Sequence, residues 1–148
     1  MSLIELIDES VIKVPLVSSS KNDVIEELLD LLVGNGTVRD RSGALDALLT
    51  RESQGSTGLE SGIAVPHAKT GAVSTLVVAI GVSSGGVDFQ ALDGKPSHLF
   101  FLMLAPPDQS GPHIEALAEI ARLARSPAFI RALIASQSAK DVMELLSE

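Results

Sequence analysis

Three kinds of side chain are missing from this 148-residue sequence, which contains no cysteine, no tryptophan and no tyrosine. The absence of cysteine excludes disulfides, thiolate metal sites and a cysteine nucleophile. Four phenylalanines are the only aromatic residues, so the sequence offers few flat surfaces on which a nucleobase or a sugar ring could stack. Any chemistry must therefore depend on histidine, carboxylate or hydroxyl groups.

Long apolar runs and a positive net charge are missing as well. The longest unbroken apolar run, 99–105, has seven residues and is far shorter than a membrane-spanning helix. The amino terminus is acidic where a secretory signal would be basic, so we expect a cytoplasmic chain that does not insert into a membrane. The net charge of −8 argues against nucleic-acid binding and favours a basic partner.

The residues that are present fit one compact domain. A chain of 148 residues with 45% apolar side chains is long enough to bury a substantial core. Because no repeat, low-complexity tract or long linker divides the sequence, we expect residues 1–148 to form a single domain.

Helical periodicity occurs in the first and last thirds of the chain, and short branched or aromatic runs occur in the middle. The predicted helices are a short one that Ser2 and Glu5 would cap, one from Ser20 to about Gly34, one from about Ser42 to Glu52, one over 113–123, one from Ser126 and one from Ser138. The predicted strands are an edge strand at 11–17, limited by Pro15, and three more at 63–65, 76–82 and 99–104, of which the later two are buried on both faces. This order predicts an α/β domain.

Two of the three histidines have unusual neighbours in the sequence. His67 follows Pro66 at the tip of a short apolar strand, where an accessible side chain on a stiff backbone suits a nucleophile. His113 stands at the start of a predicted helix, where backbone amides favour negative charge. From composition alone, each of the two could equally be an incidental histidine, on the surface or with its hydrogen bonds satisfied, or a functional one. His98 enters an apolar run, and we interpret it as a half-buried strand residue without a role.

Groups that could bind an anion precede His67. Arg51 and the turn that begins Gly55-Ser56-Thr57 together offer a guanidinium, two hydroxyls and free backbone amides, which are the donors that a phosphoryl group requires. Simpler interpretations remain open for each of them. Arg51 would also suit the end of a helix, the glycine-rich segment could be a plain turn, and Lys69 could be a solvated loop charge.

Other kinds of site find little support. The sequence has no phosphate-binding G-x-x-x-x-G-K-[ST] string, no dinucleotide-binding G-x-G-x-x-G before a helix, and no G-x-S-x-G elbow. A zinc site of three histidines is conceivable from their number, but no two of them have the close spacing usual in such motifs. We therefore expect no cofactor and no metal.

Four blocks of sequence follow one another in a characteristic order. They are 51–69, which contains the string GIAVPHAK, then 86–96, 101–106 and 113–123. In this order the blocks resemble the enzyme IIA domains of the fructose, mannitol and nitrogen-regulatory type, which belong to the phosphoenolpyruvate-dependent phosphotransferase system. The resemblance covers nearly the whole chain, and four ordered blocks make it far more specific than one short motif.

The resemblance implies a role for each candidate residue. His67 matches the residue that accepts the phosphoryl group, His113 matches the second active-site histidine in the same pocket, and Arg51 matches the arginine of the motif. It further implies a three-layer fold with a mixed sheet of roughly five strands and helices on both faces. The donor would be the small carrier protein HPr and the acceptor an enzyme IIB. Imidazole suits this task because it is nucleophilic when neutral, and its phosphorylated form stays reactive.

Two functions remain open within this family. In one, the chain is a phosphotransferase, a phosphohistidine carrier between phospho-HPr and an enzyme IIB in sugar uptake. In the other, it is a nitrogen-type regulator whose phosphorylation state controls partner proteins by binding. A hydrolase or metal enzyme that uses His67 and His113 is the third alternative. Because one domain takes up all 148 residues, we expect any enzyme IIB to be a separate chain.

Overall fold

The computed structural model describes residues 3–148 and is organised around a mixed five-stranded sheet. The strands follow the order β1-β4-β5-β2, and β3 also pairs with β5. Their bounds are β1 Ile12–Lys13, β2 Ile63–Ala64, β3 His67–Lys69, β4 Val77–Val87 and β5 Ser97–Ala105. The α/β class and the mixed sheet are therefore confirmed. The predicted cap at Ser2 lies outside the described residues.

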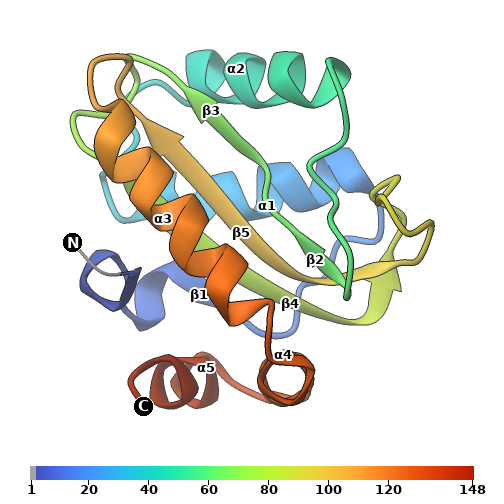
Figure 1. The fold of residues 1–148 in the computed structure, drawn as a ribbon. Helices are drawn as coiled ribbons and strands as arrows, with labels where there is room; N and C mark the ends of the chain where they lie inside the picture. The colour runs from blue at the N-terminus through green and yellow to red at the C-terminus, as the bar shows by residue number, and fades with distance from the viewer. Residues whose placement is uncertain (1–2) are drawn as a thin grey trace.

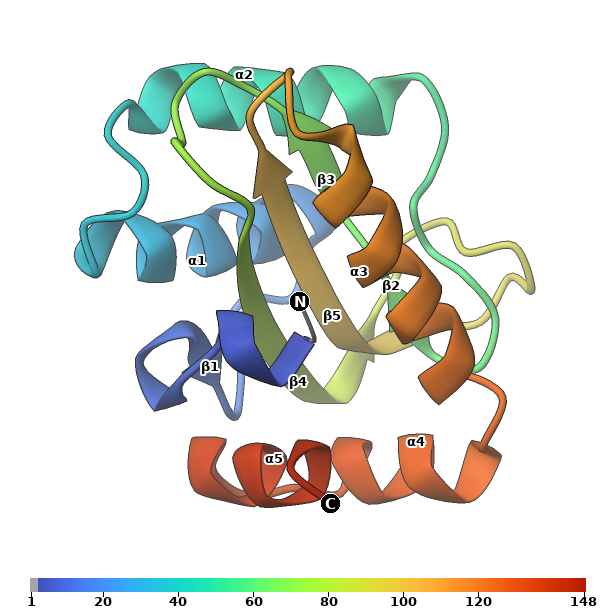
Figure 2. The ribbon, with the colours of Figure 1, turned by 60° about the vertical axis from the view of Figure 1, so that its left-hand side comes forward.

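Helices cover both faces of this sheet, as expected. The helices are α1 Lys21–Gly34, α2 Arg41–Ser53, α3 Ser110–Leu123, α4 Pro127–Ile134 and α5 Ala139–Leu146, preceded by the 3-10 turns η1 Leu3–Leu6 and η2 Glu9–Val11. Figures 1 and 2 show α1 and α2 on one side of the sheet and α3 on the other, with α4 and α5 side by side below it. Within residues 3–148, no helix is long and apolar enough to span a membrane.

Local capping signals explain where most helices begin. Ser20, Ser126 and Ser138 each accept a hydrogen bond from the backbone N–H three residues later, and each precedes a predicted helix. The short helix predicted after Ser2 is present as the 3-10 helix η1, and α2, predicted from about Ser42, begins at Arg41 because Asp40 caps it.

His67 does not lie at the tip of a strand that ends there, contrary to our expectation, but at the beginning of a further strand. His67–Lys69 forms β3, which runs parallel to β5 and pairs His67 with Met103. Pro66 interrupts the strand before it because proline has no N–H to donate, but its carbonyl still accepts from the Met103 N–H at 2.9 Å. β2 and β3 are thus two pieces of one broken edge strand, and the second piece carries His67.

Strand β4 is longer than predicted because Gly85-Gly86 does not end it. The strand continues to Val87 through an irregularity in its pairing with β5, between Val82 and Val87. Gly86 has a φ of +80°, a conformation that other residues rarely adopt. The glycine pair therefore bends the strand without terminating it.

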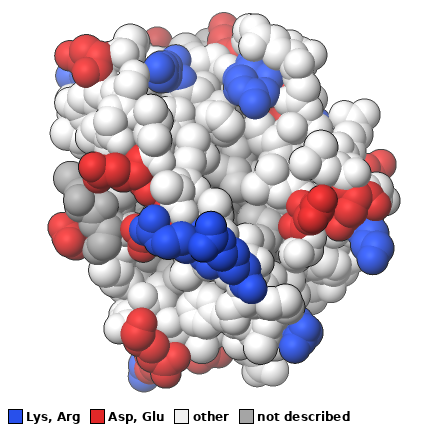
Figure 3. Space-filling model, viewed as in Figure 1, with Lys and Arg blue, Asp and Glu red and all other residues white. Residues whose placement is uncertain are grey.

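Lysine and arginine gather at two places on the face that carries α3. Figure 3 shows one group of them at the top, beside α2 and β3, and another over the C-terminal part of α3. The second place includes Arg122 and Arg125, which are exposed at the end of that helix. White, uncharged surface separates the two groups.

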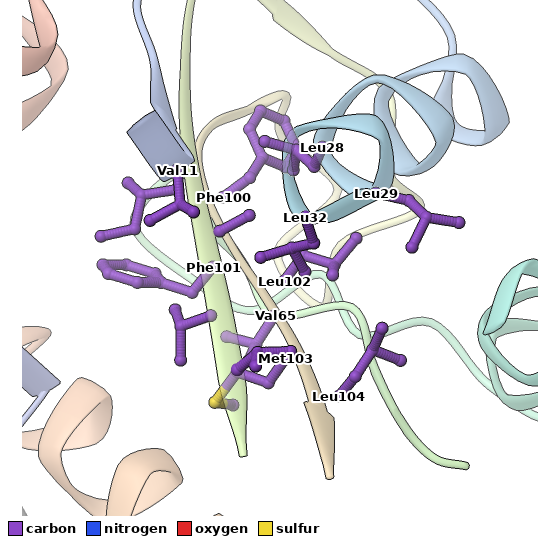
Figure 4. Packing of buried hydrophobic residues seen from close by; sticks show 14 of the residues in the cluster. Val11, Leu28, Leu29, Leu32, Val65, Phe100, Phe101, Leu102, Met103 and Leu104 are labelled. Atoms are coloured by element: carbon purple, nitrogen blue, oxygen red, sulfur yellow. The ribbon is translucent and has the colours of Figure 1, made fainter. Parts of the chain in front are cut away.

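The core is built around β5, whose apolar side chains are almost completely inaccessible to solvent. In Figure 4, Phe100, Leu102 and Leu104 point toward α1, whereas Phe101 and Met103 point to the opposite side. Burial of each such leucine or phenylalanine contributes about 2–3 kcal/mol to folding. The prediction that this strand is buried on both faces is confirmed, and β5 forms a rigid support for β3.

Helix α3 is rotated relative to the apolar stripe of its sequence, which consists of Ile114, Leu117, Ala118, Ile120, Ala121 and Leu123. Ile114, the first residue of that stripe, is 64% exposed. Of the stripe, Ile120 is buried, and the other buried residues of the helix are His113 and Ala116. The helix therefore turns His113 toward the sheet and leaves Ile114 on the surface beside it.

Candidate functional site

The imidazole of His67 is held in one tautomer by the backbone. Its Nδ1 lies 2.7 Å from the carbonyl oxygen of Val65. Because a carbonyl oxygen can only accept, Nδ1 must carry the proton in this hydrogen bond. The neutral ring therefore presents its lone pair at Nε2, which makes Nε2 the nucleophilic nitrogen. The ring is half-buried at the beginning of β3, so this nitrogen remains accessible.

His113 lies directly beside His67. The ring centroids are 5.2 Å apart and the rings meet edge to face, which confirms the prediction that both histidines share one pocket. His113 is only 6% exposed, and its Nε2 has no hydrogen-bond partner among the described residues. Burial lowers the pKa of His113, and electrostatic interactions with His67 and Lys69 lower it further. This environment favours a neutral His113 ring.

Two cations border the same cavity, which has a volume of about 500 Å³. Arg51, in the last turn of α2, donates to the carbonyl oxygen of Gly55 at 2.8 Å. Lys69 donates to the Ser110 hydroxyl at 2.9 Å. Within residues 3–148, neither cation forms an ion pair, and the only carboxylate among the residues that line the cavity is Asp46. The cavity is therefore suited to an anionic group.

Lys69 is the site residue that reasoning from the sequence missed. A solvated loop charge was one interpretation, but Lys69 belongs to β3 and is two residues beyond His67. Side chains two residues apart on a strand point to the same face, so both reach the cavity. The spacing could have revealed this only if 67–69 had been recognised as a strand.

The segment from Gly55 to Thr57 does not offer the free hydroxyls that we expected. The Ser56 hydroxyl donates to the carbonyl oxygen of Phe89. Thr57 is buried, and its hydroxyl and its N–H both donate to the Glu52 carboxylate, at 2.6 and 2.8 Å. The expectation of two free hydroxyl donors is therefore wrong, because the fold already uses both groups.

The same segment borders a smaller cavity next to His67. This cavity has a volume of about 150 Å³ and is lined by Arg51, Ser56 and Thr57 on one side and by α3 residues, including Leu117 and Ile120, on the other. Its walls are mainly apolar, and Arg51 is the one cationic residue among those that line it. His67 lines both, so it stands at their junction.

His98 lies at the other end of β5 and is half-buried, as predicted. It shares no cavity with His67 or His113. Among residues 3–148, no group of three or more histidine, aspartate or glutamate side chains is arranged to hold a metal ion.

Comparison with known proteins assigns this arrangement to a family. A family model described as "Phosphoenolpyruvate-dependent sugar phosphotransferase system, EIIA 2" matches residues 5–148. The chain belongs to this EIIA family. EIIA proteins are phosphotransferase carriers, in agreement with the resemblance noted in the sequence.

Two relatives and one solved structure show how far the similarity extends. A "PTS system fructose-specific EIIA component" of Haloferax volcanii is 42% identical over 88% of this chain and 84% of its own length. A "PTS system fructose-specific EIIABC component" of Bacillus subtilis is 36% identical over 100% of this chain, which spans only 23% of that protein. The crystal structure of "Nitrogen Regulatory Protein IIA-Ntr" from Neisseria meningitidis is 30% identical and covers 97% of this chain and 98% of its own, with a TM-score of 0.89. Relatives of both functional types are thus similar over most of the chain.

Proposed function

We propose that residues 1–148 form a single cytoplasmic phosphocarrier domain, in which His67 accepts a phosphoryl group from phospho-HPr and passes it to an enzyme IIB during sugar uptake. The observation that carries this proposal is the fixed tautomer of His67, whose Nε2 carries the lone pair beside a cavity lined by two cations that form no ion pair within residues 3–148. A nucleophilic nitrogen and an anion site are the two components that phosphoryl transfer requires.

The transfer step exchanges one N–P bond for another. The lone pair of His67 Nε2 attacks phosphorus as the N–P bond to the donor histidine breaks, and the donor imidazole leaves with that bonding pair. The proton on His67 Nδ1 remains in its hydrogen bond to Val65, which stabilises positive charge that develops on the ring. Transfer to enzyme IIB is the same step with a new nucleophile.

The surrounding groups would stabilise the transferred phosphoryl oxygens. Arg51 and Lys69 supply positive charge, and the buried Nε2 of His113 is a polar atom without a protein partner. His113 also lies in the first turns of α3, where the backbone amides favour an anion. The role of these residues would be electrostatic, because phosphoryl transfer depends mainly on positioning and charge stabilisation.

A sugar-uptake role is favoured by the fructose-specific relative, whose 42% identity exceeds the 31% and 36% of two nitrogen regulatory proteins that the chain also resembles. The second candidate function is regulation, in which the phosphorylation state of His67 controls binding to a target protein. The nitrogen-regulatory structure supports this alternative, since it covers 97% of this chain with a TM-score of 0.89.

One experiment tests the proposal and separates the two functions. The protein is incubated with labelled phosphoenolpyruvate, enzyme I and HPr, and then with a fructose-type enzyme IIB. We expect one acid-labile, base-stable phosphate that maps to His67 and is then lost to enzyme IIB. A label that maps elsewhere, or no label, contradicts the carrier function. A label on His67 that enzyme IIB cannot remove favours the regulator.

A further inference from the structure

A buried carboxylate lies immediately behind the site. Glu52 follows Arg51 in the last turn of α2, yet it is only 7% exposed and does not line the cavity that contains His113. One carboxylate oxygen pairs with the Lys21 ammonium at 2.8 Å and accepts from the Thr57 N–H. The other accepts from the Thr57 hydroxyl at 2.6 Å. A carboxylate this buried requires such partners, so the two hydrogen bonds between Glu52 and Thr57 hold the loop at Thr57 in place.

Thr57 in turn is connected to the imidazole of His67. The carbonyl oxygen of Thr57 accepts from the Val65 N–H at 3.0 Å. The carbonyl oxygen of Val65 accepts from Nδ1 of His67 at 2.7 Å. A continuous series of hydrogen bonds therefore runs from the Glu52 carboxylate to the ring that carries the nucleophile, and its last bond fixes the tautomer.

The far end of this series is anchored outside the site. Lys21 donates to the Gln90 side chain at 3.2 Å, and its ammonium lies 5.2 Å from the centre of the Phe89 ring. The Ser56 hydroxyl donates to the carbonyl oxygen of Phe89, so the same segment also holds the loop directly. Lys21 thus connects helix α1 to Glu52 of helix α2 and to the 89–90 segment. Glu52 and Phe89 in turn bind the 56–57 part of the loop before β2.

We propose that Glu52 is a positioning residue for phosphoryl transfer at His67, an inference that rests on the function proposed above. Together with Lys21, it holds the 55–57 loop so that Val65 keeps the proton of His67 on Nδ1 and Gly55 keeps the Arg51 guanidinium at the cavity. If the hydrogen bonds between Glu52 and Thr57 are lost, the His67 ring samples the other tautomer, in which Nε2 carries the proton and cannot attack. Glu52 itself touches neither the ring nor the cavity.

A second ion pair of the same construction provides a matched control. Glu27 on α1 pairs with Lys13 at 2.8 Å and accepts from the N–H groups of Val17 and Ser18 at 3.0 and 2.9 Å. Its side chain is 8% exposed, against 5% for Glu52. This pair lies beside β1, which two strands separate from β3. Glu27→Gln therefore weakens an equivalent set of hydrogen bonds, in this case to the loop at Val17 and Ser18, which does not contact His67.

The test compares Glu52→Gln, Thr57→Val and Glu27→Gln with the unmodified chain. Glu52→Gln keeps the shape of the side chain but removes its charge and one acceptor, and Thr57→Val removes only the hydroxyl. Two quantities are measured: the rate of phosphoryl transfer from phospho-HPr over a range of HPr concentrations, and the tautomer of His67 from its imidazole ¹⁵N chemical shifts.

We expect Glu52→Gln and Thr57→Val to lower the transfer rate at saturating phospho-HPr about 10- to 100-fold, which is the loss of rate typical of a slightly misplaced reacting group. The HPr concentration that gives half of the maximal rate should not change. The His67 signals should move from the Nδ1–H form toward a mixture of tautomers. Glu27→Gln should change neither quantity. Wild-type transfer rates with an intact Nδ1–H tautomer in both site variants would overturn the proposal, and so would an equal loss in Glu27→Gln.

The tautomer measurement needs no phosphoryl donor. If the unmodified chain is not phosphorylated at His67, the proposed function fails while the ¹⁵N shifts still test whether Glu52 positions the ring. If Glu52→Gln does not fold, Thr57→Val decides the outcome, because it removes the 2.6 Å hydrogen bond by which Glu52 holds the Thr57 side chain and leaves the ion pair between Glu52 and Lys21 in place.

Discussion

One histidine lies beside a cavity at each end of β5: His98 in the strand itself, and His67 in the neighbouring strand β3, where it pairs with Met103. The difference between the two ends shows what makes one of them a candidate site. His67 and His98 both place Nδ1 against a backbone carbonyl, at 2.7 Å from Val65 and 2.9 Å from Ser83. Their cavities have similar volumes, about 500 and 460 Å³. The rings are thus constrained alike, so the imidazole by itself does not distinguish the two ends.

The surroundings of the two rings are different. Arg51, Lys69 and a second histidine border the cavity at His67. The cavity at His98 is bordered by two carboxylates, Glu60 and Asp93, and by one cation, Lys95. Carboxylates repel a phosphoryl group, whereas unpaired cations attract it. The two ends therefore differ in the charge around the ring and not in the ring itself, and it is this charge that makes His67 the candidate for phosphoryl transfer.

The largest expected effect is obtained by removing each histidine in turn. His67→Ala should abolish the stoichiometric label from phospho-HPr, because within residues 3–148 no other imidazole combines an Nδ1 hydrogen bond to a backbone carbonyl with a place in the cavity of Arg51 and Lys69. His98→Ala should be labelled to the same extent as the unmodified chain. The label is measured after a fixed incubation with enzyme I and HPr. Persistence of full labelling in His67→Ala would end the assignment of His67.

The next effect concerns the cations. Arg51→Ala should slow phosphoryl transfer by about 10- to 1,000-fold and leave the fold intact, since a charge-stabilising donor is lost. Arg51→Lys should recover only part of the rate because the ammonium lacks the planar fork of guanidinium. Lys95→Ala, at the opposite cavity, is the control and should not change the rate. A wild-type rate in Arg51→Ala would mean that this residue only supports the 55–57 loop.

His113 provides a third way to sharpen the comparison, because His98 has no second histidine next to it. His113→Ala should leave His67 able to accept the label but slow transfer about 10- to 1,000-fold, as expected for the loss of a stabilising polar group. Rapid-mixing measurements with phospho-HPr give this rate. A complete loss of label on a folded protein would contradict this expectation, and mapping the phosphate in the unmodified chain would then show whether His67 or His113 is the acceptor.

Sequence reasoning succeeded wherever the physical determinants are local. The start of α1 was predictable because Ser20 and the N–H of Asp23 are only three residues apart. The burial of β5 was predictable because its apolar run has no polar break. The candidate site residues could not be assigned from local signals. Composition left the two histidines undecided, and only the resemblance to a family placed them in one pocket.

The features that were missed depend on contacts between distant segments. β3 exists because His67 pairs with Met103, and Pro66 gives the local impression that the strand has ended. A glutamate at the end of a helix is normally exposed, so nothing near Glu52 in the sequence predicts that it is buried. The rotation of α3 is likewise set by packing against the sheet, which periodicity cannot specify.

The smallest expected effect is on stability, and it follows from the burial of His113. Burial first, and then the charges of His67 and Lys69, lower its pKa in the folded protein below the ordinary value of 6.5. As the pH falls through 6.5, the unfolded chain therefore binds a proton at this position more readily than the folded chain does, and the free energy of unfolding decreases. A single group can contribute at most about 1.4 kcal/mol per pH unit to this slope.

Urea denaturation between pH 5 and 7.5 measures this effect. The free energy of unfolding should depend less steeply on pH in His113→Gln than in the unmodified chain. The slope should be intermediate in Lys69→Met, which removes one of the groups that lower the pKa of His113. An unchanged slope in His113→Gln would mean that the ring takes up its proton equally well in both states, and the cationic character of this end of β5 would then be too weak to hold the imidazole neutral.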